Sequence, residues 1–600
     1  MTTDFYVEKQ TGTFADALTA FGLARLLRDL LFYQENNKAV SVRLRDDGAY
    51  YRLICASPLS AEFLSGFTRV LAPIPLIKKV PKQKKDEAKA EEEEDQEPLD
   101  LAAGTGYWVV DYAQEFDKFK RWQEYTKKAS KDVPPDMRPE EPSRDWQIYQ
   151  TVSDHNVIKS YNRAVGLWSK THKVRGELLV ILYRLFSRLP NDVAEAEESW
   201  KALAKQHNLQ RESEPTALQL YNPDQGKGQN APKANPKLKN LKNFWLLEFL
   251  RMVGLYEGGA QQDLKNSNDH KVYVLAPVDI DSAQSSQIVA DFRRSFGYYG
   301  SITSDVMAIL NYISTLIQYS QAHPDFAAFL FSKPSVRDVV AGFQTAFYKS
   351  MGQATTMMNL SFIGLPPWLS AHSEAEVQQL NGWLKELRQL ANSLNESHSD
   401  AIGMLMELRD FLASGNLQHL FAFTAPYSGY YISQCENKKF AHQLSTTLLE
   451  EIVMSIQPQY ATIFQSQGFR NIAYAIRQST VNAQYAKARG ERRYDIRYGL
   501  GQELVRKSRR PEEFLAALAD FVTKYNAENA QIAERGIEPK RRSVATSDLE
   551  QVAALVDQYG APLIANLLVA YGYASDRRAE EPTDAASGAE ELAETASDAE

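Results

Sequence analysis

Cysteine is nearly absent from this chain, and histidine is sparse. The 600 residues include two cysteines, Cys55 and Cys435, and nine scattered histidines. Two isolated cysteines exclude a disulfide framework and a cysteine-clustered zinc site, and they are typical of a reducing cytoplasm. None of the histidines has a partner at the spacing of a metal site. We therefore expect no metal and no cofactor.

The chain also lacks long apolar runs. Its most apolar stretches, such as LLVILYRLF around Ile181, are short and interrupted by charge, whereas a membrane-spanning helix needs about 20 apolar residues in succession. The N-terminal sequence MTTDFYVEKQTG does not have the basic-then-apolar order of a secretion signal. These patterns predict a cytoplasmic protein without a membrane partner.

Recognisable catalytic motifs are missing as well. The patterns GxxxxGK[ST], HExxH and GxSxG do not occur. The segment SHSD around His398 contains the residue types of a catalytic triad, but it lies at a helix end, where such residues commonly cap. We predict that the chain is not an enzyme. The alternative is an enzyme whose site is assembled from carboxylates distant in sequence.

Charge is segregated along the chain. The net charge is −8, but residues 575–600 alone hold nine Asp/Glu and two Arg, which is typical of a solvated acidic tail. Between 78 and 100, five lysines precede Asp86, and six acidic residues fall between Glu91 and Glu97. This composition predicts a disordered surface insertion.

The first 300 residues combine helical and strand patterns. Apolar residues from Phe14 onward recur at helical spacing, with Thr13 as the predicted cap, and alternation on both sides of Asp47-Gly48 predicts a β-hairpin. The stretch KVYVLAPVDI (271–280) predicts another strand, and a helix is expected around 174–187. We therefore predict an α+β N-terminal region over 1–300.

Helical patterns dominate beyond residue 300. Amphipathic stretches include SEAEVQQLNGWLKELRQLANSLNE, SDAIGMLMELRDFLASG and PEEFLAALADFVTKYNAENAQ, and APLIANLLVAYG ends at Gly572 as a predicted glycine cap. We predict a helical middle region over 301–453, a C-terminal helical bundle over 454–574, and the acidic disordered tail over 575–600. The chain is thus expected to be multidomain.

A basic stretch stands out within the predicted bundle. Residues 470–542 hold sixteen Lys/Arg against nine Asp/Glu. On one helix over 469–487, Phe469, Ile472 and Ile476 form the buried stripe, which leaves the arginines on another face. Guanidinium groups interleaved with Tyr, Asn and Gln suit phosphates, base edges and stacking, so this pattern favours nucleic-acid binding over an ordinary cationic helix face. The predicted binding residues are Arg470, Arg477, Lys487, Arg489, Arg492, Arg493, Arg497, Arg506 and Lys507.

A second basic segment, 221–245, contains five lysines and one acidic residue among glycines and prolines. Glycine and proline exclude regular structure there, so the segment is expected to project as a loop. Its amides and lysines would suit the reading of a short duplex motif, although a disordered connector explains the composition equally well. The motif-reading candidates are Asn222, Gln225, Lys227, Gln229, Asn230, Lys233 and Asn235.

The layout resembles that of a known family. An α+β region opening with TGTFADALTAFGLARLL, followed by a helical bundle carrying FRNIAYAIRQSTVNAQY and RYDIRYGLGQELVRKS, resembles the large subunit of type I CRISPR effector (Cascade) complexes, most closely the type I-B/I-A lineage. The resemblance implies a non-catalytic antiviral-defence subunit. It would recognise the protospacer-adjacent motif in duplex DNA and help open the duplex into an R-loop, while pairing with the guide reads the sequence.

The resemblance also implies partners. These are the 5′ handle of a guide RNA, double-stranded target DNA, the backbone and 5′-end subunits of the complex, and a recruited helicase-nuclease or transposition factors. A small subunit made from the same gene is a further hypothesis, with an internal start at Met454, or alternatively at Met404 or Met406. A stand-alone RNA- or DNA-binding adaptor without a guide is the alternative function.

Overall fold

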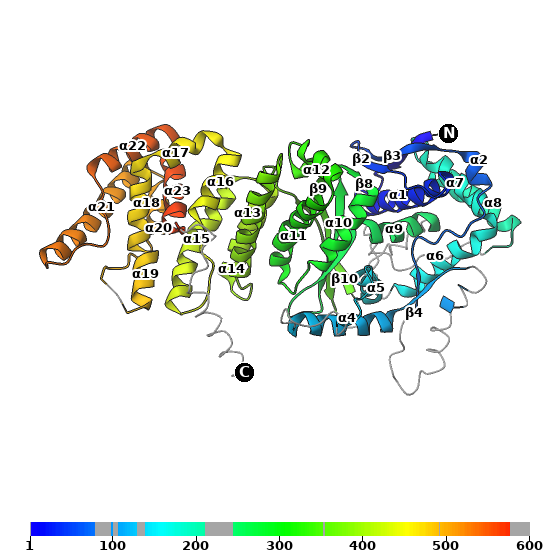
Figure 1. The fold of residues 1–600 in the computed structure, drawn as a ribbon, viewed down its shortest axis with the longest axis horizontal. Coiled ribbons are helices and arrows are strands. Elements are labelled where there is room, and N and C mark those ends of the chain that lie inside the picture. Colours follow the sequence, from blue (N-terminus) through cyan, green and yellow to red (C-terminus); the bar gives the residue numbers. More distant parts are fainter. Residues whose placement is uncertain are drawn as a thin grey trace, which may run out of the picture. The chain divides into compact units, whose positions relative to one another are not determined.

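The computed structural model describes most of the chain and divides it into two compact units. The described residues are 2–78, 98–99, 102, 106–128, 138–155, 157–209, 244–351, 355–490 and 493–576. Unit 1 comprises Met1–Ser301 and Asn311–Leu365, and unit 2 comprises Ile302–Leu310 and Pro366–Glu600. Unit 1 contains helices and sheets and unit 2 is helical (Figure 1), which confirms the predicted fold class.

The first sheet of unit 1 contains the predicted hairpin. Strands β2 (Val42–Asp46) and β3 (Tyr50–Leu59) pair antiparallel, and Gly48 takes a positive φ of 86° in the turn between them. The other two strands, β1 (Thr2–Glu8) and β8 (Asp279–Asp281), complete the order β1-β3-β2-β8. Alternate residues of the hairpin, including Leu44 and Leu53, are buried, as period-2 patterning requires.

Helix α1 (Phe14–Gln34) packs tightly against α9 (Trp245–Gly258), next to it in Figure 1. Thr13 caps α1 as predicted, because its hydroxyl accepts a hydrogen bond from the Ala15 amide. Two glycines permit the close approach of the backbones. A Cβ atom on Gly22 would lie 1.9 Å from the Leu250 carbonyl oxygen, and one on Gly254 would lie 1.9 Å from that of Leu18.

The second sheet of unit 1 extends the α+β region beyond the predicted boundary at residue 300. It has the order β10-β9-β7-β6 and is antiparallel throughout. Its strands are β6 (Gly259–Asp263), β7 (His270–Pro277), β9 (Val340–Ser350) and β10 (Thr355–Gly364). The expectation of helix nearly throughout after 300 is wrong at β9 and β10. Strand β9 pairs with the buried β7 and β10 pairs with β9, and this pairing rather than local propensity determines their conformation.

Helices surround these sheets. The prediction near 174–187 is confirmed by α7 (Arg175–Phe186). Helix α11 (Ser301–Ala322) contributes residues to both units. The remaining elements of unit 1 are α2 (Ala61–Ser65), β4 (Leu76–Lys78), β5 (Val109–Asp111), α4 (Tyr112–Lys128), α5 (Trp146–Asp154), α6 (Ile158–Lys170), η2 (Thr171–Val174), α8 (Val193–Gln206), α10 (Ser282–Arg294), α12 (Pro324–Phe331) and η4 (Val336–Asp338).

Unit 2 is built around helix α23 (Ala561–Tyr573), which is buried over most of its length. It contacts α15 (Leu417–Glu436), α18 (Gln467–Ser479), α20 (Leu500–Lys507) and α22 (Thr546–Tyr559). The predicted bundle start at 454 falls inside α16 (Thr446–Ile456). The other elements are α13 (Glu374–Asn392), α14 (Ser399–Ser414), η5 (Pro458–Tyr460), α17 (Ala461–Gln465), α19 (Val481–Ala488) and α21 (Pro511–Glu534).

Two local predictions in unit 2 are corrected. The single helix expected over 469–487 is two helices, because Thr480 leaves helical geometry at φ −122° and ψ −88° between α18 and α19. Gly572 is not a cap, because α23 continues through it to Tyr573. A Cβ there would lie 2.7 Å from Ile476 Cγ2, so this glycine lets α18 and α23 approach.

Several expectations lie outside the described residues. These are most of the insertion 78–100, the loop at 221–243, Arg492 and the tail from 577. Among the helices that the structure does describe, none combines the length and apolarity needed to cross a membrane.

Candidate nucleic-acid interface

Helix α18 presents one side to solvent and packs the other against the bundle. Ser466 caps it, and Phe469, Ile472 and Ile476 are fully buried, as their spacing predicts. Arg470, Tyr474 and Gln478 follow one another at intervals of four residues, so they lie along one side of the helix. Arg470 is exposed and the other two are half-buried.

The position of Arg477 differs from the predicted one. It was expected on the outer face of α18, but it is buried, with 4% of its surface exposed. Its guanidinium donates to the Tyr571 carbonyl oxygen at 2.7 Å and forms an ion pair with Asp576. Burial lowers the pKa of Arg477, although Asp576 opposes that effect. This side chain ties α18 to the end of α23 and has no face left for a phosphate.

Arg497 is also a structural side chain. Its guanidinium forms an ion pair with Glu528 on α21, and its backbone amide donates to the Ser479 carbonyl oxygen at 2.9 Å. Glu528 bridges to Arg541, whose buried guanidinium stacks on Tyr494 at 3.7 Å and on Tyr525 at 4.2 Å. These contacts fix the segment after α19 against α21.

A set of cations remains exposed around this framework, and we call it the basic surface. Its members are Arg470, Lys487, Arg489, Arg493, Lys540 and Arg542, and all six are exposed. The last two were not among the predicted site residues, although the run PKRRS (539–543) was a visible signal. Among the residues that the structure describes, Arg493, Lys540 and Arg542 have no ion pair.

Tyrosine rings connect the members of the basic surface. The guanidinium of Arg542 lies 4.6 Å from the ring centre of Tyr474, and that of Arg489 lies 4.3 Å from Tyr485. The Lys540 amide donates to the Tyr494 hydroxyl at 3.1 Å, next to Arg493. The contacts of Tyr474 and Tyr494 therefore bring α18 and the segments near 494 and 540 together, whereas the contact of Arg489 with Tyr485 lies within α19.

Carboxylates neutralise part of this surface. Lys487 Nζ lies 3.0 Å from Glu436 Oε1, and Arg470 Nη2 lies 3.6 Å from Glu450 Oε1. Such exposed pairs are weak, so an incoming phosphate can compete with the carboxylate for the cation. The unpaired members carry the strongest attraction for an anionic partner.

Two of the predicted binding residues, Arg506 and Lys507, lie on α20 and not on α18 or α19. Arg506 is exposed, and Lys507 pairs with Glu503 at 3.0 Å, one turn earlier on the same helix. Leu500 and Leu504 form the buried side of α20. Within the described residues, no ion pair or side-chain hydrogen bond links Arg506 or Lys507 to the basic surface.

The remaining predicted residues are placed as follows. Met454 lies in the last turn of α16, so a fragment starting there would contain α17 to α23 but not α15, which contacts α19, α20 and α23. The motif-reading candidates Asn222, Gln225, Lys227, Gln229, Asn230, Lys233 and Asn235, like Arg492, lie outside the described residues.

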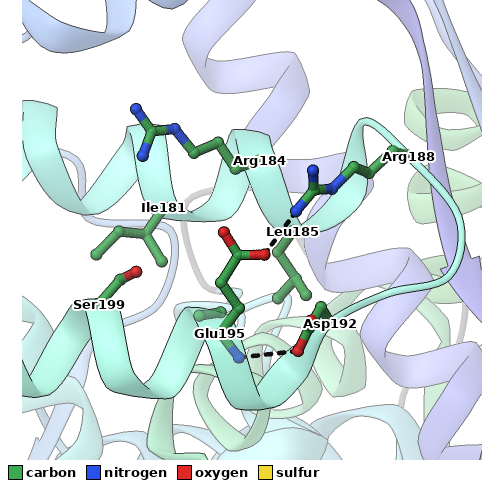
Figure 2. A pocket seen from close by; sticks show the side chains of 8 residues that line it. Ile181, Arg184, Leu185, Arg188, Asp192, Glu195 and Ser199 are labelled. Carbon is green, nitrogen blue, oxygen red and sulfur yellow. Dashed lines mark hydrogen bonds and ion pairs between the residues drawn. The ribbon is translucent and has the colours of Figure 1, made fainter.

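One small cavity lies in unit 1, whereas the basic surface belongs to unit 2. A cavity of about 20 Å³ between α7 and α8 has room for about one water molecule. Figure 2 shows Arg188 and Glu195 meeting beside it in an ion pair of 2.6 Å, while Asp192 caps α8. Within the described ranges, no three His, Cys, Asp or Glu side chains gather as a metal site would require.

Comparison with known proteins adds no relative. No protein-family model matches the chain, and a search of curated proteins finds no similar sequence.

Proposed function

We propose that this chain binds nucleic acid through the basic surface of unit 2. The observation that carries this proposal is the clustering of exposed cations with tyrosine rings, which α18, α19 and the segments near 493 and 540 contribute together. Guanidinium groups neutralise phosphates, and rings with amides nearby provide stacking and hydrogen bonds for bases. Glu528 holds the segments in place through ion pairs with Arg497 and with the buried Arg541.

Within this proposal, the chain is the non-catalytic large subunit of an RNA-guided DNA surveillance complex. The resemblance of its bundle sequences to the type I large subunit supports this assignment. The chain would recognise the protospacer-adjacent motif, help open the duplex and guide the strands along the basic surface. Its proposed partners are the guide RNA 5′ handle, target duplex DNA, the backbone and 5′-end subunits, and a recruited helicase-nuclease or transposition factors in the cytoplasm.

Salt-dependent binding tests the basic surface. We would compare the full chain with the triple variant Arg489→Ala, Arg493→Ala, Arg542→Ala, using fluorescence anisotropy with duplex DNA, single-stranded DNA and RNA. Each phosphate contact on a duplex contributes about 0.9 to the slope of log K against log salt, so the slope should fall by about 2 to 3. The loss should be similar for all sequences.

A control variant of equal charge change separates this site from a general effect. Arg184, Arg188 and Arg337 are exposed arginines of unit 1, and their replacement by alanine should leave the slope unchanged. If both triple variants lose the same slope, or if neither does, the basic surface is not the binding site. Replacing Asn230 and Lys233 should instead alter discrimination between motifs flanking the target.

Native mass spectrometry distinguishes the guided complex from a stand-alone adaptor. The chain would be tagged at its C-terminus and purified from cells carrying its gene neighbourhood. A discrete small RNA and several subunits should co-purify, and a tagged fragment beginning near Met454 would establish the internal start. Recovery of the complex without the fragment would contradict only the hypothesis of an internal start. A chain without RNA or subunits would support the adaptor and contradict the guided complex.

A further inference from the structure

Strand β10 forms one edge of the second sheet in unit 1. The sheet has the order β10-β9-β7-β6, so β9 pairs with one side of β10, and no strand of the described residues pairs with the other side. Such an edge presents a row of backbone N–H and C=O groups to any extended chain that reaches it. The proposed binding of nucleic acid by unit 2 gives this edge no role.

The direction of these backbone groups follows from the pairing with β9. The amide of Leu365, directly after β10, donates to the Ala341 carbonyl oxygen at 2.9 Å. The antiparallel register between the two strands is regular over residues 359–364, and successive residues of a strand direct their backbone groups to opposite sides. Counting back from Leu365, the N–H and C=O groups of Phe362 and Leu360 point away from β9.

The exposed side chains of this edge are apolar. Leu360 and Phe362 are 40% and 50% exposed, and they share one face of the sheet because they lie two residues apart. Met358, beside the irregularity in the register, is 58% exposed. Residues 355–364 contain no charged residue and no proline. Edge strands are normally protected by such residues, so the unprotected edge of β10 indicates that another strand covers it.

Uncharged polar side chains occupy the opposite face of β10. Ser361 Oγ lies 2.7 Å from Thr345 Oγ1 on β9, which places Ser361 on the face opposite to that of Leu360. Asn359 shares the face of Ser361, and both residues are exposed. The edge is therefore apolar on one face and polar without charge on the other.

This pattern is complementary to itself. When two β10 strands pair antiparallel about a two-fold axis at Leu360, this residue lies opposite its own counterpart. Asn359 then lies opposite Ser361 on the polar face. Met358 lies opposite Phe362 among the apolar residues. No charges are brought together, and both copies use the same surface, as a two-fold interface requires.

We propose that two copies of this chain associate through the open edge of β10. The amide of Leu360 in each copy donates to the Leu360 carbonyl oxygen of the other, and the two four-stranded sheets become one continuous antiparallel sheet. A single strand pair is a small interface, so the association depends on protein concentration. It is independent of the proposed nucleic-acid binding by unit 2.

Sedimentation velocity of the full chain tests the association. The chain, treated with nuclease beforehand, is measured from about 1 to about 100 µM, which spans weak dissociation constants. The sedimentation coefficient should rise from that of a monomer to that of a dimer. The rise should persist in high salt, because apolar contacts and backbone hydrogen bonds are not screened as exposed charges are. A chain that stays monomeric throughout overturns the proposal.

A charge introduced at the centre of the edge locates the interface. Leu360→Lys places two lysines opposite each other and should raise the dissociation constant of the dimer by at least about tenfold. Met406→Lys is the matched control, because Met406 is 41% exposed on α14 in unit 2. Thermal melting checks that both variants fold. If both weaken the dimer equally, or if neither does, β10 is not the interface.

Disulfide formation between copies tests the register. Residues opposite each other in a hydrogen-bonded pair have Cα atoms about 5.5 Å apart, a separation that a disulfide spans. Leu360→Cys should therefore give a covalent dimer on oxidation. Ser361→Cys should not, because its counterpart is displaced by two residues along the strand. The unaltered chain, which contains Cys55 and Cys435, measures the background.

Two results of this oxidation would contradict the pairing. Equal yields of covalent dimer from Leu360→Cys and Ser361→Cys would exclude a pair centred on Leu360. Capture of a different protein by Leu360→Cys, when the chain is purified together with its neighbours, would assign the edge to that protein and overturn association with a second copy. Neither result would affect the binding of nucleic acid by the basic surface.

Discussion

The core of unit 1 and the basic surface of unit 2 use the same residue type in opposite ways. Arg293 in unit 1 is 3% exposed and donates to backbone carbonyl oxygens at the C-terminal end of α9. Arg493 and Arg542 in unit 2 are exposed and have no carboxylate partner in the described residues. Arginine therefore stabilises structure where acceptors surround it, and it remains available to a partner where they do not.

Among the replacements that test this comparison, Arg293→Ala should cause the largest loss in the free energy of unfolding. Arg293→Ala leaves the carbonyl oxygens at the end of α9 unpaired and removes the ion pair with Asp145. Breaking a buried charged network costs about 3–5 kcal/mol, so the free energy of unfolding should fall by about that amount. Urea unfolding followed by tryptophan fluorescence reports on this, because six of the eight tryptophans are in unit 1.

The neighbouring Arg294 provides a matched control. It is exposed, and Arg294→Ala should change the free energy of unfolding by less than about 0.5 kcal/mol. Equal losses for the two variants would mean that burial does not distinguish these arginines, and the comparison would fail.

A second test separates the two kinds of arginine within one helix. Arg477→Ala should lower the free energy of unfolding of unit 2 by about 2 kcal/mol, because charged hydrogen bonds to Tyr571 and Asp576 are lost. Arg470→Ala should change stability little and reduce the salt slope of duplex binding by about 1. Chemical unfolding monitored by circular dichroism measures the change in stability, and fluorescence anisotropy measures the change in salt slope. The reverse pattern would show that Arg477 contacts the nucleic acid.

The third prediction concerns a pair of buried histidines in unit 1. His155 and His270 share a hydrogen bond of 2.8 Å between their Nε2 atoms, against Tyr348. Burial lowers the pKa of His155 well below 6.5, and the proximity of His270 lowers it further. Burial also lowers the pKa of His270, although Asp263 and Asp269 oppose that shift.

The sign of the pH dependence follows from these shifts. Both imidazoles are neutral in the folded chain, and unfolding lets them bind protons below about pH 6.5. Stability should therefore be retained above pH 6.5 and lost as the pH falls toward the folded pKa. The loss is about 1.4 kcal/mol for each unit of pKa shift.

Urea unfolding at pH 7.5, 6.5 and 5.5 measures this loss. His270→Gln should flatten the profile, whereas His372→Asn, at an exposed histidine, should not. A profile unchanged by His270→Gln would contradict the role of the pair.

Much of the fold could be predicted from local patterns. The hairpin of β2 and β3, the cap at Thr13 and the helix ending at Gly415 follow from period, turn chemistry and capping. Strands β9 and β10 could not be predicted in this way, because β9 depends on pairing with β7, far away in sequence, and β10 pairs in turn with β9. The same limit applies to Thr480, where α18 ends although the pattern continues.

The candidate sites were predictable to different degrees. The concentration of positive charge in 470–542 is a property of composition, and helical period identified the buried stripe beside Arg470. Helical period alone did not show that Arg477 is buried, because the residues that contact its guanidinium, Tyr571 and Asp576, are distant in sequence.

The sequence by itself determined the α+β and helical character of the two parts, the excess of cations in the bundle, and the scarcity of cysteine and histidine. These features depend on composition and on contacts within a few residues. Only the tertiary structure decided which arginines make buried contacts within the fold and which remain exposed. Burial and hydrogen-bond pairing are made by segments distant in sequence, and local patterns carry no record of which segments meet.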